Sequence, residues 1–387
     1  MNKPDYNGGS IINLISSIGG AFEYKSKYKN LRILPSSEIK LYNNVVLMVI
    51  DGLGYDFLKK NGGEKLFGNN LRGKITSVFP SSTTAAIPTF LTGDSTKQHG
   101  MTGWHSYLKE FGTIAVPLRY RERIENGADL SKLADIRSIF NIQSIFDKLK
   151  TKSFIIQPID IINSAFSKAA GGNTKRIGYS SMNTYFKAIA GTVNSSKNKK
   201  YIYAYYSEHD YLSHKKGADS KEVFRHFSKL TKKINSLVKS LEGTNTLVII
   251  TADHGEIDIP SSKRILMNDH PKLKEMLILP LCGESRFAYC YVKNSRYKDF
   301  ERYVKSKMNY CCNIYKSNEL LKNNLFGLFE ENKNLKDRIG DFVIIMKDNY
   351  AIYDRLLYQD EKNYHIGEHG GLSSQELYVP LLIFKTK

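Results

Sequence analysis

The sequence has few cysteines, no CxxC spacing and no long apolar run. Its four cysteines, Cys282, Cys290, Cys311 and Cys312, fall in one region. This pattern argues against a disulfide framework or a thiolate zinc site and indicates buried thiols of a reducing compartment. No run approaches the ~20 apolar residues of a membrane span, and the N-terminus lacks a signal-peptide pattern. We therefore expect a cytoplasmic protein without a transmembrane segment.

Acidic side chains are scarce relative to basic ones. The chain has 57 Lys and Arg against 38 Asp and Glu, a formal net charge of +19. Such a surplus favours an anionic partner such as a nucleotide, nucleic acid or acidic lipid head group. It is equally typical of solvated Lys-rich faces that keep a protein soluble. No RNA- or DNA-binding motif accompanies the charge, so polynucleotide binding is not supported beyond net charge. The sequence does not indicate the oligomeric state.

Apolar runs alternate with helical patterns, and neither an internal repeat nor a long low-complexity tract interrupts them. Residues 10–22 predict a short helix that packs on the core. Near-continuous apolar runs are typical of strands covered on both faces. These runs occupy residues 44–50, 153–158, 201–207, 246–252 and 378–384. Strand and helix alternating in this way predict an α/β fold with a doubly wound, mostly parallel sheet.

The clearest helical pattern covers about residues 221–241. Apolar side chains at helical spacing form one stripe there. The stripe consists of Val223, Phe224, Phe227, Leu230, Ile234, Leu237 and Leu241. His226 falls between the stripe positions, so we expect it to be solvated.

The pattern changes between Glu256 and about Gly340. RFAYCYVK predicts a strand and YKDFERYVKSKM a helix, and no candidate ligand cluster accompanies them. We interpret residues 256–340 as a smaller inserted α+β unit that could cap a site. Residues 1–255 and 341–387 then form the core, which the chain re-enters through FVIIMKDNYAIYD.

Charged side chains stand where two apolar runs end. Asp253 and His254 follow TLVIITA and precede Gly255. Burying either group unpaired costs several kcal/mol, so core filling is excluded. A metal site, a strand-end salt bridge or an N-cap each fits this pair. Asp51 follows VVLMVI, where a carboxylate holds a metal or a helix N-terminus equally well. Open α/β sheets bind ligands at these strand ends.

Two further signals add imidazole and carboxylate ligands. Asp210 and His214 have a D-x-x-x-H spacing, which places both on one helical face. Alone, this pair is more typical of a surface turn, and neighbouring Glu208 and His209 are alternatives. His369 lies in the loop GEHGG, with His365 as its near competitor. Carboxylate and imidazole together suit Zn²⁺ or a similar divalent ion, and six such ligands suffice for two ions.

The segment FPSSTTAAIPTFLTG supplies hydroxyls where a helix begins. Thr83 and Thr84 fall in its first turn. A helix N-terminus attracts phosphate, and a hydroxyl that touches a divalent ion becomes a nucleophile. N-capping by Ser81 or Ser82, with the threonines merely packing, is the alternative. Both interpretations can hold together.

These segments resemble a known family. VIDGLG, SVFPSSTTAAIPTFLTG with HGMTGW, the D-x-x-x-H, TADHG and GEHGG appear in family order over residues 44–385. The chain resembles the type I phosphodiesterase/nucleotide pyrophosphatase branch of the alkaline phosphatase superfamily. The resemblance implies an alkaline phosphatase-like core and a paired-metal site, usually zinc, with manganese as the alternative. The implied ligands are Asp210, His214 and His369 for one ion, and Asp51, Asp253 and His254 for the other, with Thr83 bridging as nucleophile.

The interval back from Thr92–Gly93 selects Thr83, and Thr84 is the fallback. One position departs from the family: its nucleotide pyrophosphatases place an Asn where Trp104 stands here. Trp104 could stack on a base or simply pack. The resemblance implies hydrolysis of phosphodiester or pyrophosphate bonds in a nucleotide-like small molecule. The alternatives are a phosphomonoesterase, phosphonate hydrolase or phosphoglycerate mutase of the same superfamily, and a non-catalytic basic binding protein with a degenerate site. No sulfatase pattern surrounds the nucleophile.

Overall fold

A seven-stranded sheet forms the core of the protein, in the order β2-β18-β9-β1-β8-β6-β7. The computed structural model describes residues 2–124, 126–354 and 364–386. The strands are β1 (Asn44–Ile50), β2 (Leu71–Thr76), β6 (Lys152–Pro158), β7 (Lys175–Tyr179), β8 (Lys200–Tyr206), β9 (Thr246–Thr251) and β18 (Tyr378–Thr386). The strand β18 runs antiparallel to both of its neighbours, β2 and β9, and the other neighbouring pairs in this sheet are parallel. The predicted mixed α/β fold with a large, mostly parallel sheet is confirmed.

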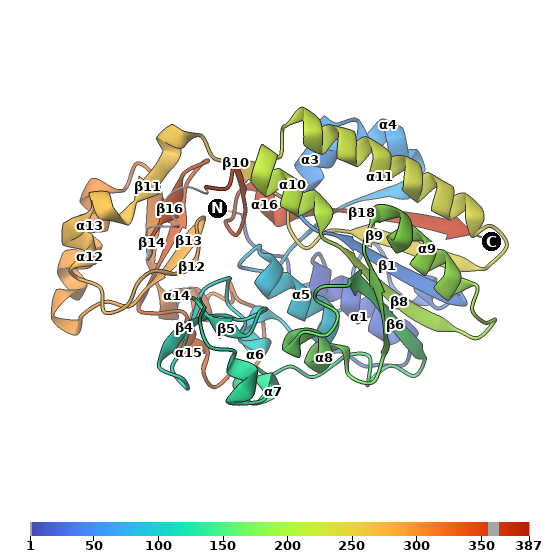
Figure 1. The fold of residues 1–387 in the computed structure, drawn as a ribbon, viewed down its shortest axis with the longest axis horizontal. Helices are drawn as coiled ribbons and strands as arrows, with labels where there is room; N and C mark the ends of the chain where they lie inside the picture. The colour runs from blue at the N-terminus through green and yellow to red at the C-terminus, as the bar shows by residue number, and fades with distance from the viewer. Residues whose placement is uncertain (1, 125, 355–363, 387) are drawn as a thin grey trace.

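Helices cover both faces of the sheet (Figure 1). One face carries α1 (Ile11–Ala21), α5 (Thr83–Thr92) and α8 (Ala165–Gly171), and the other carries α3 (Tyr55–Lys60), α9 (Met182–Val193) and α11 (Lys221–Ser240). Every residue of β1, β8 and β9 is therefore buried. This burial on both faces is the reason why these strands are almost continuously apolar.

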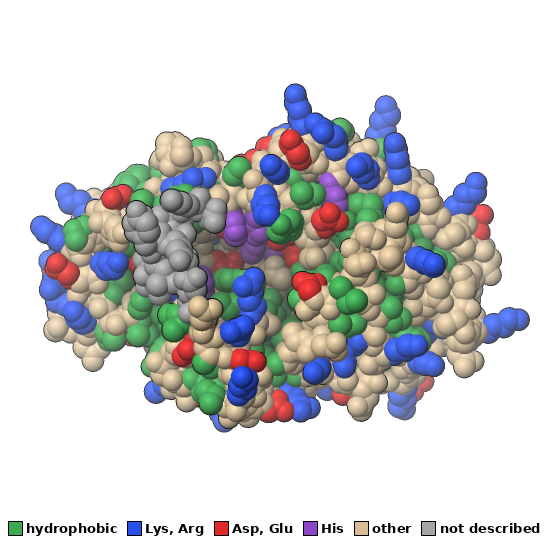
Figure 2. Space-filling view, in the orientation of Figure 1, with side chains coloured by type: hydrophobic (Ala, Val, Ile, Leu, Met, Phe, Trp, Pro, Cys, Tyr) green, Lys and Arg blue, Asp and Glu red, His purple; other side chains and the backbone are tan. Residues whose placement is uncertain are grey.

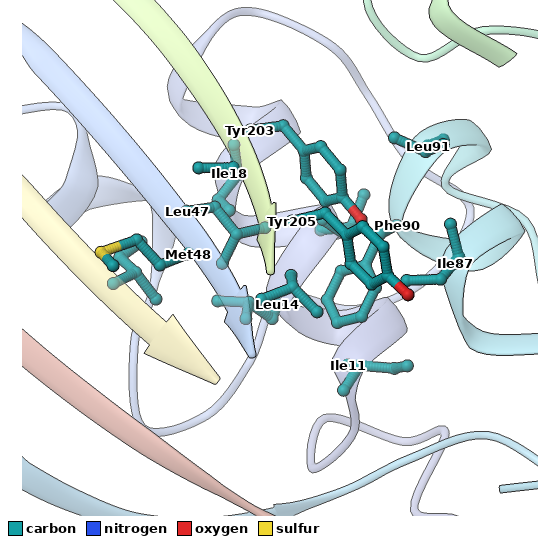
Figure 3. Close-up of a cluster of buried hydrophobic side chains, with 14 of the residues drawn as sticks. Ile11, Leu14, Ile18, Leu47, Met48, Ile87, Phe90, Leu91, Tyr203 and Tyr205 are labelled. Carbon is teal, nitrogen blue, oxygen red and sulfur yellow. The ribbon is translucent and has the colours of Figure 1, made fainter. Parts of the chain in front are cut away.

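Side chains of α1 and α5 pack on the neighbouring strands β1 and β8 (Figure 3). Leu14 and Phe90 contribute from the two helices and Leu47 and Tyr203 from the two strands, while Met48 points to the opposite face of the sheet. Successive residues of a strand alternate between faces, so the same run feeds two hydrophobic layers. This packing fixes the position of α5 on the face of the sheet formed by β1 and β8.

Helix α11 lies where the sequence predicts it, but the burial of two of its side chains differs from the prediction. Phe224, expected on the buried stripe, is 48% exposed, whereas His226, expected in solvent, is buried. The His226 ring stacks on Tyr206, with ring centroids 5.8 Å apart. The end of β8 thus supplies an aromatic surface that a helical periodicity alone does not reveal.

Shorter α-helices lie in the connections. They are α2 (Ser36–Ile39), α4 (Gly63–Phe67), α6 (Thr96–His99), α7 (Ile136–Ile139), α10 (Glu208–Lys216), α12 (Pro271–Lys274), α14 (Ser317–Lys322), α15 (Leu335–Arg338) and α16 (Ser374–Leu377). Three small sheets accompany them. Their strands are β3 (Ser106–Leu108), β4 (Thr113–Val116) and β5 (Arg121–Glu122); β10 (Ile257–Asp258) and β17 (Gly367–Glu368); and β11 (Arg264–Leu266) and β16 (Ala351–Tyr353). Among the described residues no helix combines the length and apolarity that spanning a bilayer requires.

A second sheet lies beside the core, at the left of Figure 1. Its order is β12-β13-β15-β14, formed by β12 (Cys282–Glu284), β13 (Phe287–Cys290), β14 (Cys312–Lys316) and β15 (Phe342–Met346), with helix α13 (Tyr297–Lys307) packed nearby. The strand β15 was expected to return the chain to the core, but it pairs with β13 and β14. The second sheet therefore extends past residue 340. All four cysteines are buried here as free thiols.

A buried ion pair fastens this second sheet to the core. Arg286, just before β13, donates from Nε and Nη2 to both carboxylate oxygens of Glu376 in α16, at 3.0 and 2.9 Å. Glu376 also accepts from the backbone N–H of Gly371 at 2.8 Å. Both charged side chains are at most 1% exposed. The pair thus holds the loop 369–373 between the two parts of the molecule.

Loss of Arg286 is expected to destabilise the protein strongly. Arg286→Met leaves the Glu376 charge buried without its partner, so the free energy of unfolding should fall by about 3–5 kcal/mol. Urea unfolding measures this change. Arg302→Met removes a surface pair with Asp299 whose arginine is 74% exposed, and should change stability by less than about 0.5 kcal/mol. Equal effects of the two substitutions would contradict this role of the buried pair.

Candidate active site

The carboxyl ends of three adjacent parallel strands deliver the predicted ligands to one place. Asp51 follows β1, and Asp253 with His254 follows β9. Helix α10, which begins just after β8, carries Asp210 and His214. Because β9, β1 and β8 are neighbours in the sheet, these side chains emerge at the same edge.

The first group of predicted ligands consists of Asp210, His214 and His369. Their donor atoms all lie within 4.8 Å of one another. His214 Nε2 is 3.4 Å from Asp210 Oδ2, and His369 Nε2 is 3.8 Å from Asp210 Oδ1. The helical spacing of Asp210 and His214 therefore places both on one face, and the GEHGG loop brings the third ligand from the far end of the chain.

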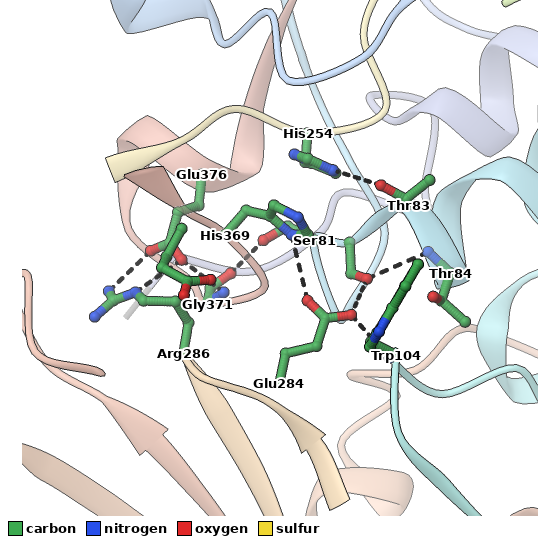
Figure 4. A network of polar contacts seen from close by, with 12 residues as sticks. Ser81, Thr83, Thr84, Trp104, His254, Glu284, Arg286, His369, Gly371 and Glu376 are labelled. Atoms are coloured by element: carbon green, nitrogen blue, oxygen red, sulfur yellow. Dashed lines mark hydrogen bonds and ion pairs between the residues drawn. The ribbon is translucent and has the colours of Figure 1, made fainter. Parts of the chain in front are cut away.

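The second group is arranged around His254. Its Nε2 atom lies 3.4 Å from Asp51 Oδ1 and 3.5 Å from Asp253 Oδ2. The hydroxyl of Thr83 approaches the same nitrogen at 3.0 Å (Figure 4). Donor atoms of Asp51, His254 and Asp210 also lie within 4.8 Å of one another. The two groups thus adjoin, and Thr83 faces the second one.

The carboxylates fit cations because each keeps an oxygen unpaired. The Tyr205 hydroxyl donates to Asp51 Oδ2, and Asp253 Oδ1 accepts backbone N–H groups of Gly52 and His254 at 3.2 and 3.0 Å. Asp51 Oδ1, Asp253 Oδ2 and Asp210 Oδ1 are buried with no hydrogen-bond partner in the described parts of the chain. Buried oxygens of this kind cost free energy unless a cation or donor meets them. Three carboxylates and three imidazoles suit divalent ions such as Zn²⁺.

The electrostatics of the protein side chains point the same way. Burial, together with Asp253 and Asp210, raises the pKa of Asp51 well above its ordinary value. Burial also raises the pKa of Asp253 to about 6. For Asp210, burial acts upward, but the imidazoles led by His214 outweigh it and lower its pKa to about 2. Burial therefore disfavours the charged forms of Asp51 and Asp253, a cost that a bound cation would offset.

Thr83 lies at the N-terminus of α5 and is partly exposed, unlike the buried residues on either side of it. Ser82 caps the helix by accepting from the Thr84 backbone N–H at 3.3 Å. Thr84, the fallback nucleophile, is fully buried, and its hydroxyl has no partner among the described side chains. Ser82 thus caps the helix, while the hydroxyl of the next residue, Thr83, points to the predicted ligand groups.

Trp104 lies beside the N-terminus of α5 (Figure 4). Its indole ring is half-buried, and the Arg119 guanidinium lies over it at 5.4 Å. Its backbone N–H donates to Glu284 Oε1 at 3.0 Å. The tryptophan is therefore at the rim of the site, although its side chain offers no amide to hold a phosphate oxygen.

Of the alternative ligands, Glu208 and His209 lie away from the two groups, and His365 lies next to the first. Glu208 accepts from the Tyr206 hydroxyl at 2.7 Å. His209 is buried against Phe57, and burial lowers its pKa to about 3. His365 lies at the edge, with its ring 4.1 Å from that of His214 and its side chain 53% exposed. Glu208 and His209 belong to neither group, whereas His365 forms a third cluster with His214 and Glu368, whose potential ligand atoms all lie within 4.8 Å of one another.

Three contributors to the site were missed from the sequence: Tyr205, Glu284 and Glu256, a buried carboxyl group whose pKa is raised well above its ordinary value by burial and by Asp210. Tyr205 belongs to an apolar strand, where nothing distinguishes it from its core-facing neighbours. Glu284 ends β12 of the second sheet, in a region without an evident ligand cluster. Its carboxylate accepts from the Ser82 hydroxyl, and its Oε2 lies 3.3 Å from His369 Nδ1. Only the docking of the second sheet on the core brings Glu284 here, so no local pattern could indicate it.

The fold and this site together define an α/β protein in which carboxylate and imidazole groups lie beside a hydroxyl at a helix N-terminus. Residues 45–372 match the family model for type I phosphodiesterase/nucleotide pyrophosphatase. The chain belongs to this family. No curated protein matches it significantly.

Solved structures share the fold at low sequence identity. Murine ectonucleotide pyrophosphatase/phosphodiesterase 5 superposes with a TM-score of 0.64 at 16% identity, covering 87% of each chain. The human form of that protein gives 0.63 at 15%, covering 88% of this chain and 87% of its own. Phosphonoacetate hydrolase from Sinorhizobium meliloti 1021 gives 0.64 at 16%, covering 89% of this chain and 90% of its own.

Removing the buried carboxylate of Asp253 is expected to stabilise the protein when a chelator keeps it free of metal. Because the folded-state pKa of Asp253 is raised to about 6, its contribution to stability is complete below its ordinary value and is lost as pH rises through 6. Asp253→Asn abolishes this loss, so in chelator at pH 7.5 the variant should be more stable than wild type by about 1–3 kcal/mol. At pH 4 the difference should disappear.

Thermal unfolding in chelator across pH 4–8 measures this effect. Asp299→Asn, which alters only a surface pair with Arg296 and Arg302, is the control and should follow the wild-type pH dependence. An Asp253→Asn profile parallel to wild type would contradict a raised pKa at this carboxylate.

Proposed function

We propose that this protein hydrolyses phosphodiester or pyrophosphate bonds of nucleotide-like substrates, with Thr83 as the nucleophile. The observation that carries the proposal is the position of the Thr83 hydroxyl, 3.0 Å from His254 Nε2 and next to buried carboxylate oxygens without partners. Asp51, Asp253 and His254 would hold one divalent ion, and Asp210, His214 and His369 the other. Zinc is the proposed metal and manganese the alternative.

When bound, such ions stabilise negative charge on the nucleophile and on the leaving oxygen. The side chains of the protein then have separate tasks. The Thr83 hydroxyl gives up its proton to solvent, and its Oγ1 atom attacks phosphorus in line with the leaving oxygen. The bond to the leaving group breaks, the leaving oxygen takes a proton from solvent, and water then hydrolyses the phosphoryl ester formed on Thr83. The N-terminus of α5 offers the positive end of its dipole to the phosphoryl oxygens. Capping by Ser82 fixes the first turn of the helix and so the direction of the hydroxyl.

The relatives support a small phosphate-containing ligand. The murine pyrophosphatase/phosphodiesterase 5 was also solved as an inactive threonine-to-alanine variant in complex with AMP. The net charge of +19 favours an anionic substrate. In Figure 2 the basic side chains are spread over the visible face, while histidines gather at its centre. A small nucleotide-like substrate fits this distribution better than a polynucleotide, which requires a continuous basic track.

Phosphonate hydrolysis is the second candidate. Phosphonoacetate hydrolase, solved with phosphonoformate and with phosphonoacetate, shares the fold as closely as the pyrophosphatases do. Trp104 also stands where the nucleotide pyrophosphatases have an asparagine. The two candidates use the same ligand groups and Thr83, and they differ in the leaving group.

Substitution of Thr83 should abolish turnover without emptying the site. With the nucleophile removed, Thr83→Ala should lose at least about 10³-fold in kcat on a nitrophenyl phosphodiester, while elemental analysis finds near-normal metal content. Thr84→Val is the matched control, because the Thr84 hydroxyl is buried without a partner, and it should retain turnover. If Thr83→Ala keeps its activity, another group is the nucleophile.

A substrate panel separates the remaining candidates. The zinc- or manganese-loaded protein should have a higher kcat/KM for the nitrophenyl ester of a nucleoside monophosphate than for nitrophenyl phosphate or phosphonoacetate. A preference for phosphonoacetate selects the second candidate, and a preference for the monoester selects a phosphomonoesterase. Absence of turnover on all three, together with absence of bound metal, would identify a binding protein with a degenerate site.

A further inference from the structure

The three imidazoles of the site all present Nε2 to the predicted ligand groups, but their Nδ1 atoms have different neighbours. His214 Nδ1 bonds to the carbonyl of Gly367 at 2.8 Å, and His254 Nδ1 bonds to the carbonyl of Gly255 at 3.2 Å. His369 Nδ1 instead faces a side chain, Glu284 Oε2, at 3.3 Å. A partner at one ring nitrogen determines which nitrogen is free to bind a metal.

Glu284 is itself held in place by its other oxygen. Its Oε1 accepts from the Trp104 backbone N–H at 3.0 Å and from the Ser82 hydroxyl. The side chain is only 8% exposed. Because two donors fix Oε1, the direction of Oε2 toward His369 is fixed as well (Figure 4).

The backbone around Glu284 is built for this approach. Gly283 exchanges two backbone hydrogen bonds with His105, at 3.0 and 2.6 Å. Its φ is +92°, and a Cβ added there would lie 2.8 Å from the Phe287 ring and 2.9 Å from the Phe287 carbonyl oxygen. Only glycine fits such a position without strain. Gly283, the residue before Glu284, thus attaches the second sheet to the loop that carries Trp104 and His105.

We propose that Glu284 is a positioning residue that accepts the Nδ1–H of His369 and so turns Nε2 of this imidazole toward an ion shared with Asp210 and His214. The proposal rests on the proposed metal-dependent function. In this proposal, one of the two ion sites depends on Glu284, a residue of the second sheet. His214 and His254 are oriented instead by the backbone carbonyls of Gly367 and Gly255. The same carboxylate links this ligand to Ser82, the cap of the nucleophile helix.

The test is the affinity of Glu284→Gln for Zn²⁺ alone, measured by competition with a chromophoric chelator. Glutamine has the same shape, but with its oxygen toward Ser82 and Trp104 it offers an N–H to His369 and favours the wrong tautomer. One of the two Zn²⁺ ions should bind about 10–100-fold more weakly, and the other should be unchanged. Glu38→Gln, at a surface pair with Arg72 and Lys385, is the control and should bind both ions normally.

Kinetics supply a second measurement. Raising the Zn²⁺ concentration should restore kcat of Glu284→Gln toward wild type with little change in KM, which a merely structural defect would not do. Normal affinity for both ions in Glu284→Gln would overturn the inference, whatever the thermal stability of the variant. Failure of the wild-type protein to bind Zn²⁺ would instead overturn the proposed function.

Discussion

Buried charge of one sign at the end of the sheet is the constraint on which the rest of the structure depends. Asp51, Asp210 and Asp253 converge where three parallel strands end, and their titratable neighbours include each other, the imidazoles and the buried Glu256. Carboxylates removed from water are costly unless cations or donors compensate them. The fold supplies donors to one oxygen of Asp51 and of Asp253 and leaves the other oxygen facing inward. That arrangement costs the protein stability unless a cation or another donor meets these oxygens.

The second sheet takes part in the site and is not only an appendage to the core. Arg286 pairs with Glu376 beneath the loop that carries His369, and Glu284 reaches the imidazole itself. Both contacts converge on the same loop from the same sheet. The position of His369 relative to Asp210 therefore depends on how the two parts of the molecule dock. Docking of the second sheet therefore bears directly on the surroundings of His369.

Much of the fold could be predicted because buried parallel strands are nearly continuous in hydrophobicity. The runs that end at Asp51 and Asp253 identify both the strands and the ligands that follow them. Other features depend on tertiary contacts. The apolar run of β15 suits a buried strand of the core sheet as well as one of the second sheet, so the sequence could not show to which sheet it belongs. His226 is buried by an aromatic neighbour from β8, and Glu284 approaches Ser82 and His369 across more than 80 residues of sequence. Local periodicity contains no information about such encounters.

Anomalous X-ray diffraction from crystals grown with Zn²⁺ tests the central claim most directly. The account predicts two anomalous peaks, one within about 2.0–2.2 Å of donor atoms of Asp210, His214 and His369. The other should lie equally close to Asp51, Asp253 and His254, beside Thr83 Oγ1. A single peak, or peaks bound only by surface side chains, would contradict a two-ion site at the ends of these strands.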